Sequence, residues 1–141
     1  MSTQRNPCLS LALRRADRVV SQIYNRHIGP TGVRGTQFSV LTVIAEFDCI
    51  TARDLSEALQ MDQTTASRAL QPLVREGYIT AKPAPHDRRE KMLCLTKTGR
   101  KVHKEAQAAW DKAQEELREK LGKRDSEALL RVTRRVYQLA E

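Results

Sequence analysis

One stretch of the chain, residues 63–71, carries hydroxyl, amide and guanidinium groups at spacings that suit contacts with DNA. At about 100° per residue, a helix that follows Asp62 and runs to Gly77 separates an apolar arc from an opposite polar arc. The first residues of such a helix can reach base edges, and Arg68 is placed for a bidentate contact with guanine. Pro72 should kink the helix, so the contacting half is expected before it. The expected contact residues are Gln63, Thr64, Thr65, Ser67, Arg68 and Gln71. The alternative is a solvated helix face that contacts nothing.

A second group of cations surrounds Asp87 in the turn-rich stretch 83–90. The strand-like runs 78–82 and 91–95 flank this stretch, so the sequence predicts a hairpin with a basic tip. Arginine at such a tip suits a narrow minor groove, whose negative potential is enhanced. A charge-assisted hydrogen bond from Arg89 to Asp87 is expected to hold the arginine in place. The expected contact residues of the tip are Asp87, Arg88, Arg89 and Lys91. An ordinary charged turn is the alternative.

Two short helices joined by a tight turn are expected to position the first of these groups. Thr51 and Asp62 are suitable N-caps, residues 60–62 form the turn, and Gly77 suits the end of the second helix. This arrangement is a helix-turn-helix. The sequence thus predicts a mainly α-helical fold with a small β-hairpin, in which residues 36–97 form a DNA-binding block of winged helix-turn-helix type.

The flanking regions, residues 1–35 and 98–141, are expected to be dimerisation helices within the same single domain, 1–141. Asn6 and Pro7 suit the start of the first helix, and Thr36 the start of the next. A helix of about 25 residues after Thr96 would be roughly 37 Å long, more than a domain of this size covers by itself. Asp125 is expected to cap the last helix. The apolar stripes of these helices therefore predict a second subunit.

Composition narrows the functional class. The 141 residues include 25 Lys and Arg against 17 Asp and Glu, a formal charge of +8 that favours a polyanionic partner. Aromatic residues make up only 4%, which disfavours a base-stacking surface for single strands. We see no apolar run long enough for a membrane span, no cofactor loop, no spacing for a metal site and no catalytic constellation. The expectation is a cytoplasmic protein that is not an enzyme and needs no cofactor or metal.

Several short motifs resemble the MarR family of bacterial transcriptional regulators. They are Asp87-x-Arg89 followed by Leu93-x-Leu95-Thr96-x-x-Gly99, then Gln37-Phe38-x-Val40-Leu41, and Leu73-x-x-x-Gly77-Tyr78-Ile79. The resemblance implies a homodimer bound to a palindromic operator, and repression that a small molecule or an oxidant relieves. By position, it makes Arg89 the minor-groove arginine and Asp87 its anchor.

Two kinds of signal are considered for the regulator, a small ligand and an oxidant. The resemblance implies a crevice for aromatic or phenolic acids, with His27, Arg34, Phe38 and Phe47 as candidate lining residues, although His27 also suits a plain helix end. The redox candidate is Cys8: with Asn6 as N-cap, it sits where unpaired amides favour a thiolate. The alternative is a terminal cysteine without a role.

The other two cysteines, Cys49 and Cys94, are interpreted as small packing residues, at a helix end and in a strand. No disulfide framework is expected from the odd number and wide spacing of the cysteines.

Two other classes compete with a sequence-specific regulator. Net charge alone gives non-specific affinity for DNA, as in an architectural DNA-binding protein. The second competing class is a protein-interaction module built on the long helix after Thr96. The spaced polar arc on residues 63–71 favours the regulator, because architectural binding does not require it.

Overall fold

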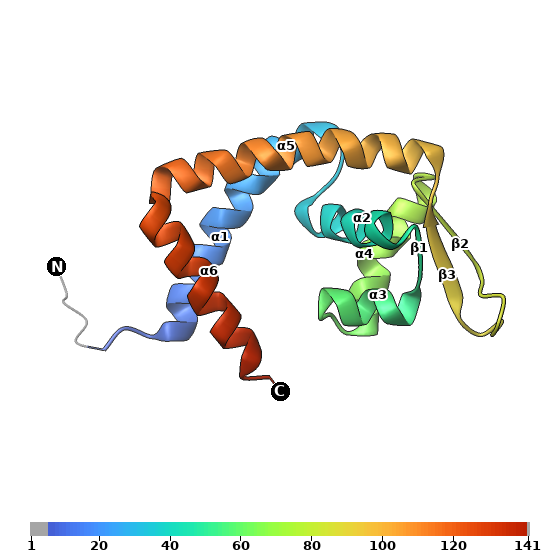
Figure 1. The fold of residues 1–141 in the computed structure, drawn as a ribbon, viewed down its shortest axis with the longest axis horizontal. Helices are drawn as coiled ribbons and strands as arrows, with labels where there is room; N and C mark the ends of the chain where they lie inside the picture. The colour runs from blue at the N-terminus through green and yellow to red at the C-terminus, as the bar shows by residue number, and fades with distance from the viewer. Residues whose placement is uncertain (1–5, 141) are drawn as a thin grey trace.

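A computed structural model describes residues 6–140 of the chain. The elements are α1 (Leu9–Ile28), η1 (Gly29–Thr31), α2 (Gly35–Phe47), β1 (Cys49–Thr51), α3 (Ala52–Leu59), α4 (Gln63–Arg75), β2 (Ile79–Pro83), β3 (Lys91–Leu95), α5 (Lys97–Leu121) and α6 (Lys123–Gln138). Figure 1 shows α5 crossing the molecule, with α1 and α6 beneath one end and α2, α3, α4 and the sheet beneath the other. The long helix α5 thus connects two groups of elements. We call α1 and α6, with the adjoining end of α5, the helical arm, and α2, α3, α4 and the sheet the central block.

The core lies in the central block and is built around α2. Val40, Leu41 and Ile44 have no exposed surface, which agrees with the apolar residues around most of this helix. Leu73 of α4 and Leu93 of β3 belong to the same buried cluster. The predicted helix-turn-helix and hairpin therefore pack on a common support.

Three of the predicted helix starts are confirmed. The hydroxyl of Thr51 accepts a hydrogen bond from the Asp54 amide at 3.1 Å. Asp62 likewise caps α4, and Thr96 caps α5 by accepting from the Gly99 amide at 2.9 Å. These caps depend on neighbours three residues away, so local sequence was sufficient to locate them.

Three other helix starts were wrong. The first helix begins after Cys8, not Asn6, and the Cys8 sulfur accepts from the Leu11 amide at 3.5 Å. The last helix begins after Gly122, whose positive φ of 82° ends α5 and turns the chain directly into α6. Asp125 is therefore inside α6 and does not cap it.

The second helix starts after Arg34 rather than at Thr36. Its first amide, that of Gly35, donates to the Asn25 side chain of α1 at 3.1 Å. A side chain ten residues earlier satisfies this amide, so the helix begins before the expected hydroxyl cap.

The sheet has three antiparallel strands in the order β1-β3-β2. The predicted hairpin is confirmed: Ile79 pairs with Leu95 and Pro83 with Lys91. The third strand, β1, was not predicted. It places Cys49 in a strand opposite Cys94, and not at a helix end.

Cys49 and Cys94 form a disulfide, which corrects their interpretation as packing residues. Their Cα atoms are 4.4 Å apart, because the register of β1 on β3 places the two residues directly opposite each other. Their sequence neighbours Ile50 and Leu93 point into the core. Because successive side chains of a strand point to opposite faces, both cysteines lie on the outer face of the sheet.

The helical arm keeps much apolar surface exposed. Within the described part of the chain, α6 has no buried residue at all. Its exposed hydrophobic side chains are Leu129, Leu130, Val132, Val136 and Tyr137. On α1, Leu9 and Leu13 are exposed as well. Among residues 6–140, no helix combines the length and apolar character that crossing a membrane requires.

Candidate nucleic-acid interface

The N-terminus of α4 is held by Asp62, which positions the first polar side chains of the helix. One carboxylate oxygen of Asp62 accepts from the Thr65 amide at 2.8 Å, and the other accepts from the Thr65 hydroxyl at 2.8 Å. These two hydrogen bonds lower the pKa of the Asp62 carboxyl below its ordinary value. Thr65 thus has a capping role in addition to the predicted contact with DNA.

All six residues predicted on α4 lie on its exposed side. They are Gln63, Thr64, Thr65, Ser67, Arg68 and Gln71. On the opposite, apolar arc Ala66 and Leu73 are buried and Leu70 is half-buried, as predicted, whereas Val74 at its end is 38% exposed. Pro72 is half-buried, and the helix continues past it to Arg75.

The loop between β2 and β3 is fixed by its own backbone hydrogen bonds. Asp87 accepts from the backbone amide of Arg89 at 2.9 Å. Asp87 thus acts on Arg89 through the main chain, where a bond to the guanidinium had been expected. The Glu90 amide donates to the Asp87 carbonyl at 3.1 Å, and the Ala84 amide donates to the Glu90 carbonyl at 2.8 Å. These hydrogen bonds hold the main chain of the turn, while the Arg89 side chain stays exposed.

The helix-turn-helix and the loop meet around a surface hollow of about 540 Å³. From α4 it is lined by Gln63 and Ser67, and from the loop and β3 by Asp87, Arg89 and Lys91. Five of the predicted contact residues, from segments about 20 residues apart, are therefore brought to one place. The other five, Thr64, Thr65, Arg68, Gln71 and Arg88, do not line the hollow and are exposed elsewhere.

Sequence reasoning missed Arg53, which lines the same hollow from the first turn of α3. Its side chain lies 3.7 Å from Glu57 and is mostly exposed. The sequence did contain an indication of this role. Arg53 follows the N-cap Thr51 by two residues, so it belongs to the first turn of α3, and this turn faces the hollow. Together with Arg89 and Lys91, it adds a third cation to this surface.

Two of the four candidate ligand residues line a second hollow of about 390 Å³ between α1, α2 and α5. These are Arg34 and Phe38, accompanied by Tyr24 and Trp110. The rings of Phe38 and Trp110 have centroids 6.1 Å apart, and those of Tyr24 and Trp110 are 6.3 Å apart. Met61, in the turn between α3 and α4, closes one side. The lining combines aromatic surface with one guanidinium.

The other two candidates do not line this hollow. His27 lies at the end of α1, with its Nε2 3.4 Å from Glu116 of α5. Phe47 lines a separate hollow of about 660 Å³ beside the disulfide. The structure therefore does not bring His27 and Phe47 together with Arg34 and Phe38.

Cys8 is exposed and is not part of a disulfide. Its sulfur caps α1, as described above, so it meets the first-turn amide of Leu11 directly. It lies at the start of α1 and lines none of the three hollows.

The family model of the MarR family matches residues 31–90, from the last residue of η1 to the end of the β2–β3 loop. The multiple antibiotic resistance protein MarR of Salmonella typhimurium is 33% identical over 78 residues, which are 55% of this chain and 54% of that protein. The aligned part thus spans about half the length of that relative.

Solved structures resemble the chain over a longer range. The M. tuberculosis transcriptional regulator MOSR, in complex with DNA, is 30% identical with a TM-score of 0.84, covering 95% of this chain and 96% of that one. A mutant of MarR from E. coli complexed with operator DNA is 25% identical with a TM-score of 0.82, covering 91% and 92%. The similarity therefore includes the helical arm as well as the central block.

Proposed function

Because the chain belongs to the MarR family and has its winged-helix fold, we propose that it is a transcriptional repressor that binds a palindromic operator as a homodimer and is released by a small aromatic or phenolic ligand. In this proposal residues 36–97 bind DNA, residues 1–35 and 98–141 form the dimer, and the protein works in the cytoplasm.

The observation that carries the proposal is the hollow shared by α3, α4 and the β2–β3 loop. A duplex seated there would meet Gln63 and Ser67 in the major groove, and Arg89 in the adjacent minor groove. Arg53 and Lys91 are suited to bind the phosphates between the two grooves. Both similar structures with DNA described above have this architecture, which supports the assignment.

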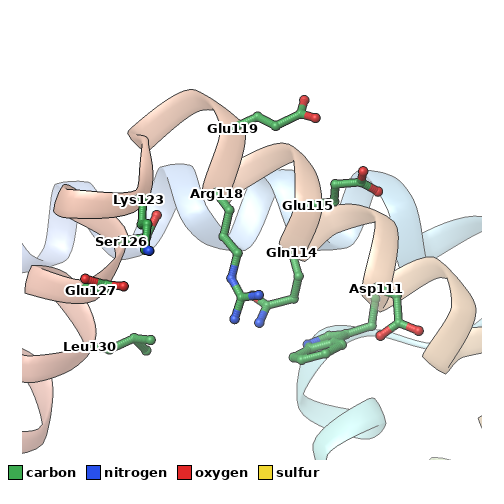
Figure 2. Close-up of a pocket in the computed structure, with 10 residues that line it drawn as sticks. Asp111, Gln114, Glu115, Arg118, Glu119, Lys123, Ser126, Glu127 and Leu130 are labelled. Carbon is green, nitrogen blue, oxygen red and sulfur yellow. The ribbon is translucent and has the colours of Figure 1, made fainter.

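The homodimer is supported by the exposed apolar surface of the helical arm. A helix with no buried residue, such as α6, gains little from packing in the single chain. The bend between α5 and α6 also encloses a hollow of about 700 Å³. Figure 2 shows Gln114 and Arg118 pointing into this space from α5, and Leu130 facing it from α6, while Glu119 points away. A helix of the second copy would fill this hollow and cover the apolar residues of α6.

The ligand assignment is supported by the hollow that contains Arg34, Phe38, Tyr24 and Trp110. Its aromatic rings suit a planar apolar ligand, and the Arg34 guanidinium suits a carboxylate. It also borders Met61 in the turn of the helix-turn-helix. A ligand there would contact both the arm and the DNA-binding block, so it could change their relative position.

A thiol-based oxidant sensor that uses Cys8 is the alternative within the same family. The exposure of Cys8 and its place at the start of α1 favour this alternative. An architectural DNA-binding protein, without sequence preference, is the alternative from another class.

One titration series separates these possibilities. Fluorescence anisotropy at one fixed salt concentration would compare a duplex from upstream of the protein's own gene with a scrambled duplex of equal composition. A repressor should bind the first more tightly than the second by about a thousandfold or more. Equal affinity for both duplexes would identify an architectural protein instead.

The same complexes would then be titrated with benzoate and hydroxybenzoates, and separately with peroxide. Release by the aromatic acid, lost in Arg34→Gln but kept in the control Arg134→Gln, supports the ligand site. Arg134 is exposed on α6 and lies outside the ligand hollow, so this control removes the same charge without touching the site. Release by peroxide alone, lost in Cys8→Ser, supports the thiol sensor.

A further inference from the structure

The disulfide between Cys49 and Cys94 occupies a place where a purely structural bond is not needed. The two residues face outward from the sheet, and Cys49 is exposed. On the other face, Ile50 and Leu93 already pack β1 and β3 into the core, with exposed fractions of 7% and 0%. The backbone pairing of the strands also runs through three successive residue pairs. The sheet is thus held together without the sulfur bridge.

The bridge connects the two parts of the candidate interface. Cys49 begins β1, and β1 leads through the N-cap Thr51 directly into α3 of the helix-turn-helix. Cys94 lies in β3, the central strand, whose first residue Lys91 follows the β2–β3 loop. A covalent bond between positions 49 and 94 therefore fixes the offset between the helix-turn-helix and the loop that carries Arg89.

The bridge is also open to reagents. A surface hollow of about 660 Å³ lies beside it, lined by Cys49, Phe47, Met92 and His86, among others. Phe47 is 56% exposed, so the hollow offers apolar surface to a small organic molecule as well as access for water. Cys94 is only half-buried. The bridge can thus be approached from solvent on the side of Cys49.

From this geometry we propose that Cys49 and Cys94 form a reversible dithiol–disulfide modification site, oxidised by hydroperoxides and reduced by dithiols, which sets the rigidity of the DNA-binding surface. The consequence for DNA depends on the proposed function, whereas the chemistry of the pair does not. A protein that works on DNA in the cytoplasm meets a reducing environment, where disulfides are mostly transient and redox-sensing.

The oxidation proceeds in two balanced steps. The more exposed Cys49 attacks the hydroperoxide as thiolate: an S–O bond forms, the O–O bond breaks, and the alcohol leaves after taking up a proton. Cys94 then attacks the sulfenic sulfur of Cys49, forming the S–S bond while the S–O bond breaks and water leaves. Two thiols and one hydroperoxide thus give one disulfide, one alcohol and one water. A dithiol reverses the bond by two thiol–disulfide exchanges and is itself oxidised.

The oxidised form should bind DNA more tightly, because its two contacting parts are already fixed at the spacing seen in the structure. Preorganisation of this kind lowers the entropic cost of binding, and we expect reduction to weaken binding by about threefold to tenfold. Binding is not abolished, because the strand pairing remains.

The test uses the full chain carrying Cys8→Ser, which leaves Cys49 and Cys94 as the only cysteines. Samples reduced with dithiothreitol, or oxidised with hydrogen peroxide, are freed of reagent, alkylated and mapped by mass spectrometry. The expected result is two alkylated cysteines in the reduced sample and a peptide linked through positions 49 and 94 in the oxidised one. Adding Cys49→Ser should prevent the link. Thiols that stay alkylatable after peroxide, or that oxidise separately without linking, would overturn the proposal.

The same samples are then titrated onto the labelled duplex from upstream of the protein's own gene, at one salt concentration. The reduced form should bind more weakly, and Cys49→Ser with Cys94→Ser should show no difference between treatments. Equal affinity of the linked and reduced forms would overturn the effect on the DNA-binding surface. Absence of sequence-specific binding in both forms would instead contradict the proposed function, and the peptide map would still decide whether the redox pair exists.

Discussion

Gly99 of α5 lies directly against the backbone carbonyl of Tyr78, so closely that a Cβ atom at position 99 would overlap the carbonyl oxygen. The same oxygen accepts a hydrogen bond from the Thr96 amide at 3.0 Å, and the Thr96 hydroxyl donates to the Gly77 carbonyl at 2.6 Å. The start of the long helix is therefore attached to the segment between α4 and β2. This contact fixes the position of the first turn of α5 relative to α4 and β2.

Gly99→Ala should destabilise the fold, because the obstructing atom is backbone and cannot rotate away. Overpacking of this kind costs about 1–3 kcal/mol. For a chain of this length, that corresponds to a melting temperature lower by roughly 3–10 °C. Gly29→Ala is the matched control, since a Cβ at Gly29 meets no atom within 4 Å and its φ is −50°. Equal melting temperatures of the two variants would contradict the close approach.

Arg89→Ala should weaken binding to the duplex by about 1–3 kcal/mol, most strongly where the site is rich in A·T pairs. The reason is the loss of the side chain that lines the hollow together with Gln63 and Ser67 of α4. Arg134→Ala removes the same charge from α6, outside the hollow, and should change the affinity much less. Anisotropy at fixed salt measures both. A loss of similar size in the two variants would mean that only net charge matters.

Arg68→Ala should relax the choice of base at one position of each half-site. A bidentate contact with guanine contributes about 1–3 kcal/mol of discrimination. By contrast, Arg53→Ala should weaken all duplexes by a similar factor, because Arg53 is positioned for phosphate. Affinities for a set of single-base variants of the duplex distinguish the two patterns. If Arg68→Ala lowered the affinity for all duplexes equally, Arg68 would be assigned to contacts with the DNA phosphates instead.

Leu129→Glu should convert a dimer to monomers, because it places a charge in the apolar surface of α6. Leu129 is 39% exposed in the single chain, so the variant should keep its fold. Gln138→Glu adds the same charge on the opposite side of this helix, about 180° away, and should remain dimeric. Sedimentation equilibrium and circular dichroism provide the two measurements. A dimeric Leu129→Glu would place the interface elsewhere.

Stability should decrease below neutral pH through His103. This residue stacks on Phe38, with ring centroids 5.7 Å apart, and its Nε2 lies 3.2 Å from the Thr42 hydroxyl. Burial lowers the pKa of His103 from its ordinary value of 6.5. The unfolded chain therefore takes up a proton before the folded chain does, as pH falls below about 6.5. The stability present above that pH is lost progressively as the pH decreases toward the folded value.

Urea denaturation at pH 7.5 and pH 5.5 tests this expectation. His103→Gln should show a smaller change between the two pH values than the unmodified protein. His86→Gln is the control, because His86 is exposed on the β2–β3 loop. An unchanged pH dependence in His103→Gln would assign the effect to other groups.

The sequence alone determined what depends on near neighbours. The caps Thr51, Asp62 and Thr96 each bind an amide three residues ahead, so their patterns are visible in a short window. Periodicity located the exposed arc of α4 and the basic tip between β2 and β3. The family resemblance came from motifs of the same short range, and the comparisons confirmed it.

Only the tertiary structure decided what depends on distant segments meeting. Strand β1 has three residues, too few to show alternation, so the pairing of Cys49 with Cys94 across 45 positions could not be foreseen. Arg53 lines the same hollow as Arg89 because α3 and the β2–β3 loop meet there. Phe47 and Phe38 line different hollows although both belong to α2. Local propensities set each element, but packing of the core sets their relative positions, and these positions bring side chains together.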